Sequence, residues 1–184
     1  MFQVRIHGRG GQGVVTAAEL LSVAAFREGR HAQAFPSFGS ERTGAPVVAF
    51  CRIDERPIRV REPIVEPDAL IVQDPTLLHQ VDLFGGLRPG GSVLLNSTRS
   101  AAELGLEQLD GRVVTVPATD LAREHLGRPL PNAALLGAFS AICGLVTMES
   151  VAAAIRERFP TAPAEANVSA AQAAFQLVTE PAHA

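Results

Sequence analysis

The sequence contains no lysine, no tryptophan and no tyrosine, and it has only two cysteines in 184 residues. The absence of lysine excludes Schiff-base catalysis and a P-loop lysine, so basic contacts fall to arginine, which favours planar, bidentate binding of carboxylates or phosphates. Cys51 and Cys143 lie far apart in apolar runs and form no CxxC motif. We expect both in the core, and no zinc site or iron–sulfur cluster held by this chain alone.

Excess positive charge and long apolar runs are also missing. The net charge is −3, so no basic field is present to attract nucleic acid or an anionic membrane. The first residues, MFQVRIHG, lack the basic start and apolar run of a signal peptide, and no uncharged apolar stretch is long enough to span a membrane. We therefore expect a cytoplasmic protein. The histidines show no metal-ligand spacing and are interpreted as surface or packing residues: His7, His31, His79, His125 and His183.

Hydrophobic periodicity predicts strands that alternate with helices. Strands are expected at 2–7, 31–35, 69–74, 92–97 and 112–117, with an antiparallel pair formed by 46–53 and 57–61. Helices are expected at 14–26, 132–146, 148–159 and 164–178, with Gly29 ending the first and Thr147 capping the third. This order predicts a single α/β domain over 1–184. Its fold is Rossmann-like and three-layered, a mostly parallel sheet with an antiparallel edge hairpin and a helical C-terminal part.

The most informative stretch is IHGRGGQGVVTAAELL, residues 6–21, where a strand runs through a glycine cluster into an apolar helix. Gly8, Gly10 and Gly13 match G-x-G-x-x-G, which is typical of a turn that holds a phosphate at a helix start. The same glycines would also serve if they only let the strand and helix pack closely. A bound NAD is disfavoured, because the second strand, RHAQAFPS, has no acidic residue to hold the ribose.

The exact sequence of the glycine turn, GRGGQG, places backbone N–H groups beside Arg9 and Gln12. It resembles the gamma subunits of the 2-oxoacid:acceptor oxidoreductases, which open with a strand, G-x-G/A-G-Q-G and an apolar helix. The segment QAFPSFGSERTGAPVVAFCRI, residues 33–53, is similar to the second hallmark of that family, and residues 66–78 and 131–146 resemble its later segments. The form of the second segment is closest to the pyruvate:ferredoxin oxidoreductase (pyruvate synthase) branch. The sequence departs from other branches at Phe38, where many relatives carry tyrosine, and at Thr43-Gly44-Ala45, where they carry a Gly-Gly pair.

The resemblance implies a subunit of an enzyme that oxidatively decarboxylates pyruvate with coenzyme A and passes the electrons to ferredoxin. It implies that thiamine diphosphate, Mg²⁺ and iron–sulfur clusters sit on alpha, beta and delta partner subunits. This chain has no thiamine diphosphate motif and no cluster cysteines, so alone it is expected to be inactive and to have no catalytic residue. Another 2-oxoacid, such as 2-oxoglutarate or an aryl pyruvate, remains an alternative substrate. A free-standing nucleotide- or coenzyme A-binding module remains an alternative of a different class.

Two segments form the candidate site: the glycine turn, residues 8–13, and the loop of residues 37–45. Both follow strands whose ends we expect at one sheet edge. Contact with the partner subunits near the coenzyme A entrance is favoured over direct contact with coenzyme A. Arg9 and Arg42 are candidates to contact a phosphate or a partner carboxylate, with Glu41 pairing with Arg42. The candidate residues are Gly8, Arg9, Gly10, Gly11, Gln12, Gly13, Glu41, Arg42, Thr43 and Gly44.

Overall fold

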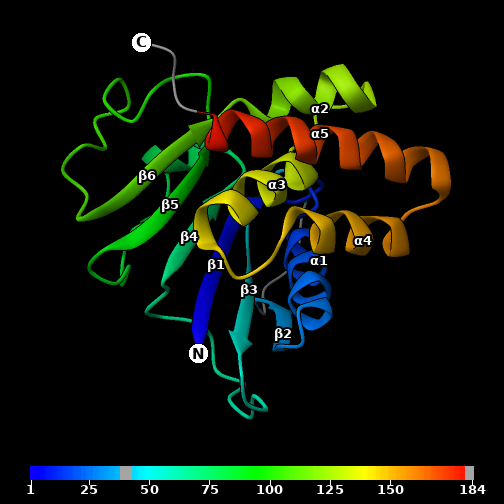
Figure 1. The fold of residues 1–184 in the computed structure, drawn as a ribbon. Helices are drawn as coiled ribbons and strands as arrows, with labels where there is room; N and C mark the ends of the chain where they lie inside the picture. The colour runs from blue at the N-terminus through cyan, green and yellow to red at the C-terminus, as the bar shows by residue number, and fades with distance from the viewer. Residues whose placement is uncertain (38–42, 181–184) are drawn as a thin grey trace.

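The computed structural model describes residues 1–37 and 43–180, and it contains a six-stranded sheet in the order β2-β3-β1-β4-β5-β6 (Figure 1). The strands are β1 (Phe2–Arg9), β2 (His31–Pro36), β3 (Pro46–Asp54), β4 (Ala69–Val72), β5 (Gly91–Asn96) and β6 (Gly111–Val116). β1, β4, β5 and β6 are parallel, whereas β3 runs antiparallel to both of its neighbours, β1 and β2. The expected α/β class, with a mostly parallel sheet and an antiparallel edge hairpin, is confirmed.

The composition of that hairpin was predicted wrongly. β3 pairs with β2 and β1, and residues 57–61 form no strand. Both edges of β3 are therefore occupied by neighbouring strands and cannot pair with residues 57–61. In addition, Pro57 has no N–H to donate to a β-sheet hydrogen-bond ladder. The Arg52 guanidinium, on a residue only 2% exposed, donates instead to the carbonyls of Val60 and Glu62. A buried side chain thus holds the segment that the alternation pattern assigned to a strand.

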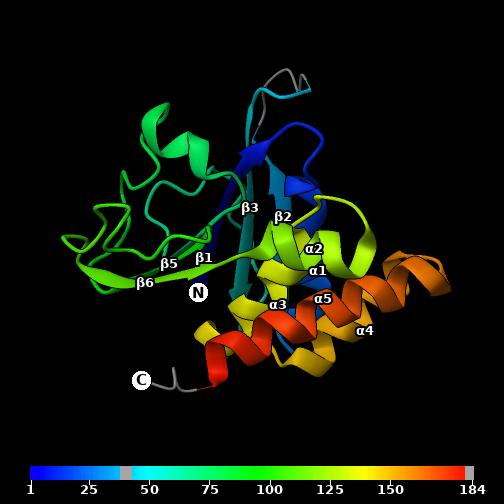
Figure 2. The same cartoon turned by 90° about the horizontal axis from the view of Figure 1, so that it is seen from above.

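The helices all pack on one face of the sheet (Figure 2). They are α1 (Val14–Arg27), α2 (Ala118–Leu126), α3 (Asn132–Cys143), α4 (Met148–Arg158) and α5 (Thr161–Thr179). Alternate strand residues such as Ile71 and Leu94 enter the large core beneath these helices, while Val72 and Leu95 point to the opposite face. That second face is covered by the 3₁₀-helix η1 (Pro75–His79) and by loops, which form the third layer.

Four of the five helices were predicted, whereas α2 was not, and α3 ends at Cys143 rather than at 146 because Gly144, with φ 62°, ends it. Gly29 follows the end of α1 with φ 76°, and Thr147 caps α4 in a capping box with Ser150. α5 begins at Thr161, so Pro163 lies in its first turn rather than before it, where a missing N–H costs nothing. None of the helices in the described part of the chain has the length and apolar character needed to cross a bilayer.

Candidate functional site

The glycine turn joins the end of β1 to the start of α1. It also contacts residues 43–45, the end of the second segment of the candidate site. Gly10 forms an isolated bridge with Thr43, the Gly10 N–H donates to the Ala45 carbonyl at 2.9 Å, and the Gly44 N–H donates to the Gly10 carbonyl at 3.1 Å. The structure therefore brings Thr43 and Gly44 to the turn as expected. Glu41 and Arg42, like Phe38, lie outside the described residues.

Two glycines of the turn are required by close packing. A Cβ on Gly8 would lie 2.6 Å from Val14 Cγ2, and one on Gly13 would lie 2.7 Å from Asn132 Nδ2 at the start of α3. Gly13 also has φ 73°, a conformation that favours glycine. Gly11 has φ 94° but open space around it, so only its backbone conformation calls for glycine. Tight packing of β1, α1 and α3 accounts for Gly8 and Gly13 without any ligand.

Arg9, a candidate anion contact, is held within the chain. Its Nε donates to Asp74 Oδ2 at 3.1 Å, and its NH1 donates to the Gly44 carbonyl at 3.0 Å. Its NH2 donates to Thr76 Oγ1 at 2.7 Å and to Gln80 Oε1 at 2.8 Å. The guanidinium therefore ties the turn to the second segment and to η1, and most of its donors are already used.

Gln12 completes this arrangement, which we call the Arg9–Asp74 clamp (Arg9, Gln12, Asp74 and Thr76). Gln12 Oε1 accepts the Arg9 N–H at 2.8 Å, and Nε2 donates to Asp74 Oδ2 at 2.9 Å. Burial would raise the pKa of Asp74, but hydrogen bonds from Thr76 and Gln12 and the charge of Arg9 outweigh it and lower that pKa. The carboxylate is thus kept ionised to anchor the turn.

Sequence reasoning did not single out Asp74. The signal was present, because Asp74 lies two residues after the end of the buried strand β4 and at the same sheet edge as the glycine turn. An acidic residue just past the end of a buried parallel strand is placed to meet side chains from the neighbouring strand ends.

A hollow of about 330 Å³ lies at the start of α1. No side chain caps this helix, and its first turn carries no acidic residue. The first backbone N–H groups of an uncapped helix favour an anion, because they have no partner within the helix and carry its positive dipole end. The hollow is lined by Arg9, Gly10, Gly11, Gly13, Val14, Val15, Thr16 and Val47.

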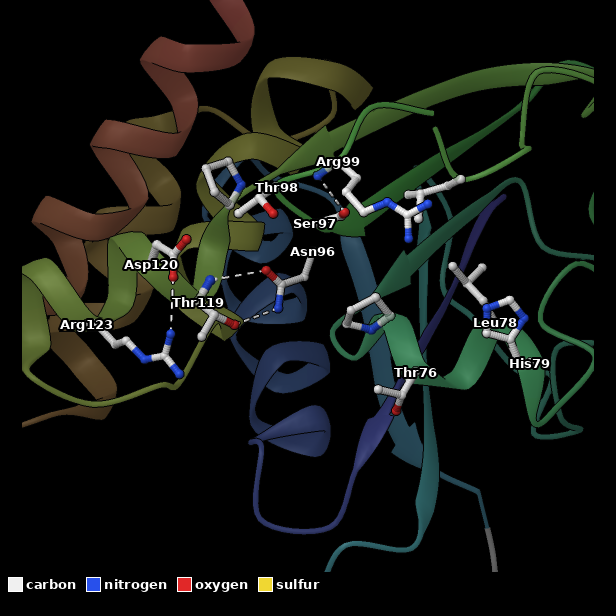
Figure 3. A pocket seen from close by; sticks show the side chains of 13 residues that line it. Thr76, Leu78, His79, Asn96, Ser97, Thr98, Arg99, Thr119, Asp120 and Arg123 are labelled. Carbon is white, nitrogen blue, oxygen red and sulfur yellow. Dashed lines mark hydrogen bonds and ion pairs between the residues drawn. The ribbon is translucent and has the colours of Figure 1, made fainter. Parts of the chain in front are cut away.

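A second, larger hollow of about 440 Å³ lies at the carboxyl ends of β4, β5 and β6 (Figure 3). Asn96, at the end of β5, builds its floor. Its Nδ2 donates to the Gln73 carbonyl and to Thr119 Oγ1, both at 2.7 Å, and its Oδ1 accepts the Thr119 N–H at 3.1 Å. Sequence analysis assigned no role to this hollow.

The described residues do not fit an iron–sulfur cluster or a metal site. No group of three or more His, Cys, Asp or Glu side chains among them converges as metal ligands would. Cys51 is fully buried in β3, where burial raises the pKa of its thiol to about 12, and Cys143 lies at the end of α3. Both cysteines pack against the core, as predicted.

Comparison with known proteins identifies the family. The family model described as pyruvate ferredoxin/flavodoxin oxidoreductase matches residues 3–177. The chain is 52% identical to the pyruvate/ketoisovalerate oxidoreductases common subunit gamma of Thermococcus kodakarensis, covering 95% of this chain and 96% of the relative. It is 47% identical to pyruvate synthase subunit PorC of Methanothermobacter thermautotrophicus, over 97% of this chain and 96% of the relative. The crystal structure of pyruvate oxidoreductase subunit PORC from Thermotoga maritima superposes with a TM-score of 0.83 at 34% identity, covering 95% of each chain. The chain therefore belongs to the pyruvate ferredoxin/flavodoxin oxidoreductase family, in the branch of its gamma subunits.

Proposed function

We propose that this chain is the gamma subunit of a multi-subunit, thiamine diphosphate-dependent pyruvate:ferredoxin oxidoreductase. That enzyme converts pyruvate and coenzyme A to acetyl-CoA and CO₂ and reduces ferredoxin. Full-length similarity to subunits named for pyruvate synthase supports this function. The partners are alpha, beta and delta subunits, which carry thiamine diphosphate, Mg²⁺ and the iron–sulfur clusters, and the complex is cytoplasmic.

The observation that carries the role of this subunit is the clamped glycine turn beside an uncapped helix start. The Arg9–Asp74 clamp fixes the backbone of the turn, so the N–H groups at the start of α1 are held in place before anything binds. Preorganised donors bind an anion without the cost of ordering a loop. The turn thus offers a rigid corner to a partner carboxylate or to a phosphate of coenzyme A.

In this proposal Arg9 acts through the clamp, and the contacts outside the chain fall to the backbone of the turn and to Arg42. Arg42 directly precedes Thr43, the residue that forms a bridge with Gly10. Glu41 is proposed to pair with Arg42. We favour contact with the partner subunits near the coenzyme A entrance over direct contact with the coenzyme.

The choice of 2-oxoacid is proposed to lie in other subunits. The relative from Thermococcus kodakarensis is named as a gamma subunit common to pyruvate and ketoisovalerate oxidoreductases, so one gamma chain there serves two substrates. Pyruvate is our proposal for this chain. 2-Oxoglutarate or an aryl pyruvate is the alternative within the same function.

The test is Arg42→Ala in the complete complex, with Arg59→Ala in the exposed 57–61 segment as the matched control. Loss of assembly at unchanged coenzyme A affinity supports the partner contact. A raised KM for coenzyme A in an intact complex supports the ligand contact. A complex with unaltered assembly and kinetics refutes both roles for Arg42.

The alternative function, a free-standing nucleotide- or coenzyme A-binding module, makes a different prediction. Copurification with alpha, beta and delta chains, followed by native mass spectrometry with cofactor content measured per subunit, supports the gamma-subunit proposal. A stable monomer that binds NAD tightly without partners supports the module instead.

A further inference from the structure

The larger hollow at the ends of β4, β5 and β6 has the composition of a site for a small organic anion. It is separate from the glycine turn, because η1 and the clamp residue Thr76 form the wall on that side (Figure 3). One wall is apolar and comes from Pro75 and Leu78 of η1 and from Leu104, whereas Pro117 directly precedes α2 on the side of Thr119. The other carries the side chains of Ser97, Thr98 and Thr119, which follow β5 and begin α2.

The hydroxyl groups of this wall are oriented by bonds that they accept. Ser97 Oγ accepts the Arg99 N–H at 2.9 Å, and Thr119 Oγ1 accepts from Asn96 at 2.7 Å. Each hydroxyl keeps its own proton for donation, since no acceptor for it is found among the described residues. Because Asn96 is only 6% exposed and uses both ends of its amide on Gln73 and Thr119, the floor that holds these hydroxyls is rigid.

Two arginines, Arg99 and Arg123, and one carboxylate, Asp120, line the hollow. Arg99 forms no salt bridge within residues 1–37 and 43–180, and its guanidinium donates to the Glu103 carbonyl. Arg123 pairs with Asp120 at 3.2 Å, but both side chains are more than half exposed, so this pair holds its partners weakly. Figure 3 shows Arg99 and Arg123 on opposite sides of the hollow, so an anion beside Arg99 would find one charged donor there and hydroxyl donors next to it.

We propose that this hollow binds a phosphate ester of about the size of a nucleoside monophosphate, with its phosphate on Arg99 and the Ser97 hydroxyl and its organic part against Leu78 and Leu104. The volume of about 440 Å³ lies within the range of small-ligand pockets. A guanidinium and neighbouring hydroxyls match the several oxygens of a phosphate better than the two of a carboxylate. The apolar wall can pack against the base or sugar of a phosphate ester, whereas inorganic phosphate has no organic part to contact it. This site goes beyond the proposed function, since it involves neither the glycine turn nor coenzyme A.

The experiment measures AMP binding to the purified complex by calorimetry, with adenosine and ribose 5-phosphate as comparison ligands. We expect AMP to bind at least about tenfold more tightly than adenosine, and Arg99→Gln to weaken AMP binding by a similar factor. Arg112→Gln, at the opposite end of β6, is the matched control and should leave AMP binding unchanged. Coenzyme A at saturation should not displace AMP.

Three outcomes overturn the proposal. The first is the absence of binding by both AMP and ribose 5-phosphate at millimolar concentrations. The second is equal binding of AMP and adenosine, or AMP binding that Arg99→Gln and Arg112→Gln change alike. The third is displacement of AMP by coenzyme A, which would assign the hollow to the coenzyme. Failure of the gamma-subunit proposal appears separately, as failure to copurify with partner subunits.

Discussion

Acid should destabilise this protein in part through His7, a buried histidine in β1. His7 is 5% exposed, and its Nε2 accepts a hydrogen bond of 3.0 Å from Arg5 Nε. The Arg5 guanidinium also donates to the carbonyls of Leu83 and Gly85 at 2.8 Å, so it is fixed in this position. Protonation of His7 would therefore place an N–H donor against a cation, in a site with little access to water.

The size of the effect follows from the pKa. Burial, and next the charge of Arg5, lowers the pKa of His7 from 6.5 to about 4. Each pH unit in this interval corresponds to about 1.4 kcal/mol, so the neutral His7 contributes about 3 kcal/mol to the free energy of unfolding. Because the unfolded chain takes up the proton at the higher pH, this contribution is complete above about pH 6.5. It is lost progressively as the pH falls toward 4.

The assay is urea unfolding of the full chain at several pH values between 4 and 7, compared with His7→Gln. Glutamine offers Arg5 an acceptor but does not titrate, so the variant should lose less stability than the wild type across this interval. Titration of the other groups cancels in the difference. Parallel curves for the two proteins, with no pH-dependent difference, would refute the assignment of the effect to His7.

Two further changes test the packing and the clamp. A Cβ on Gly137 in α3 would lie 2.0 Å from the Ala171 carbonyl oxygen of α5, so Gly137→Ala should destabilise the chain by about 3 kcal/mol or more in urea unfolding. Ala153→Gly in α4 is the comparison, with a cost of about 1 kcal/mol from helix propensity alone, and equal costs would contradict the steric argument. Asp74→Asn removes the charge from the clamp and should cost about 1–3 kcal/mol above pH 5, with the cost shrinking in acid as the lowered pKa of Asp74 is reached. The exposed Glu107→Gln serves as its control, and the same loss in both variants would show that the clamp adds no stability.

The candidate site was predictable in position more than in contacts. Strand ends at one sheet edge and a glycine turn before a helix can be read from the sequence, and the structure does join the turn to Thr43 and Gly44. The partner of Arg9 was not predictable, because Asp74 lies 65 residues away and reaches it only through the β1–β4 pairing. Sequence alone left Arg9 free to bind a ligand, whereas the fold uses it inside the chain.

The larger hollow escaped sequence analysis for the same reason. Its wall residues come from η1, the loop after β5 and the start of α2, and none of these segments forms a recognisable motif by itself. Only the parallel order of β4, β5 and β6 brings them to a common edge.

By itself, the sequence determined the class of the sheet, four of the five α-helices, the packing of both cysteines against the core and the family, because each is encoded in local periodicity, capping residues or short motifs. Tertiary structure decided which strand pairs with β3, which face the helices cover and which polar groups meet at the sheet edge. These outcomes depend on competition between distant segments for the same ladder edges and the same donors. Residues 57–61 alternate as a strand should, yet β1 and β2 already occupy both edges of β3, and a buried arginine holds that segment instead.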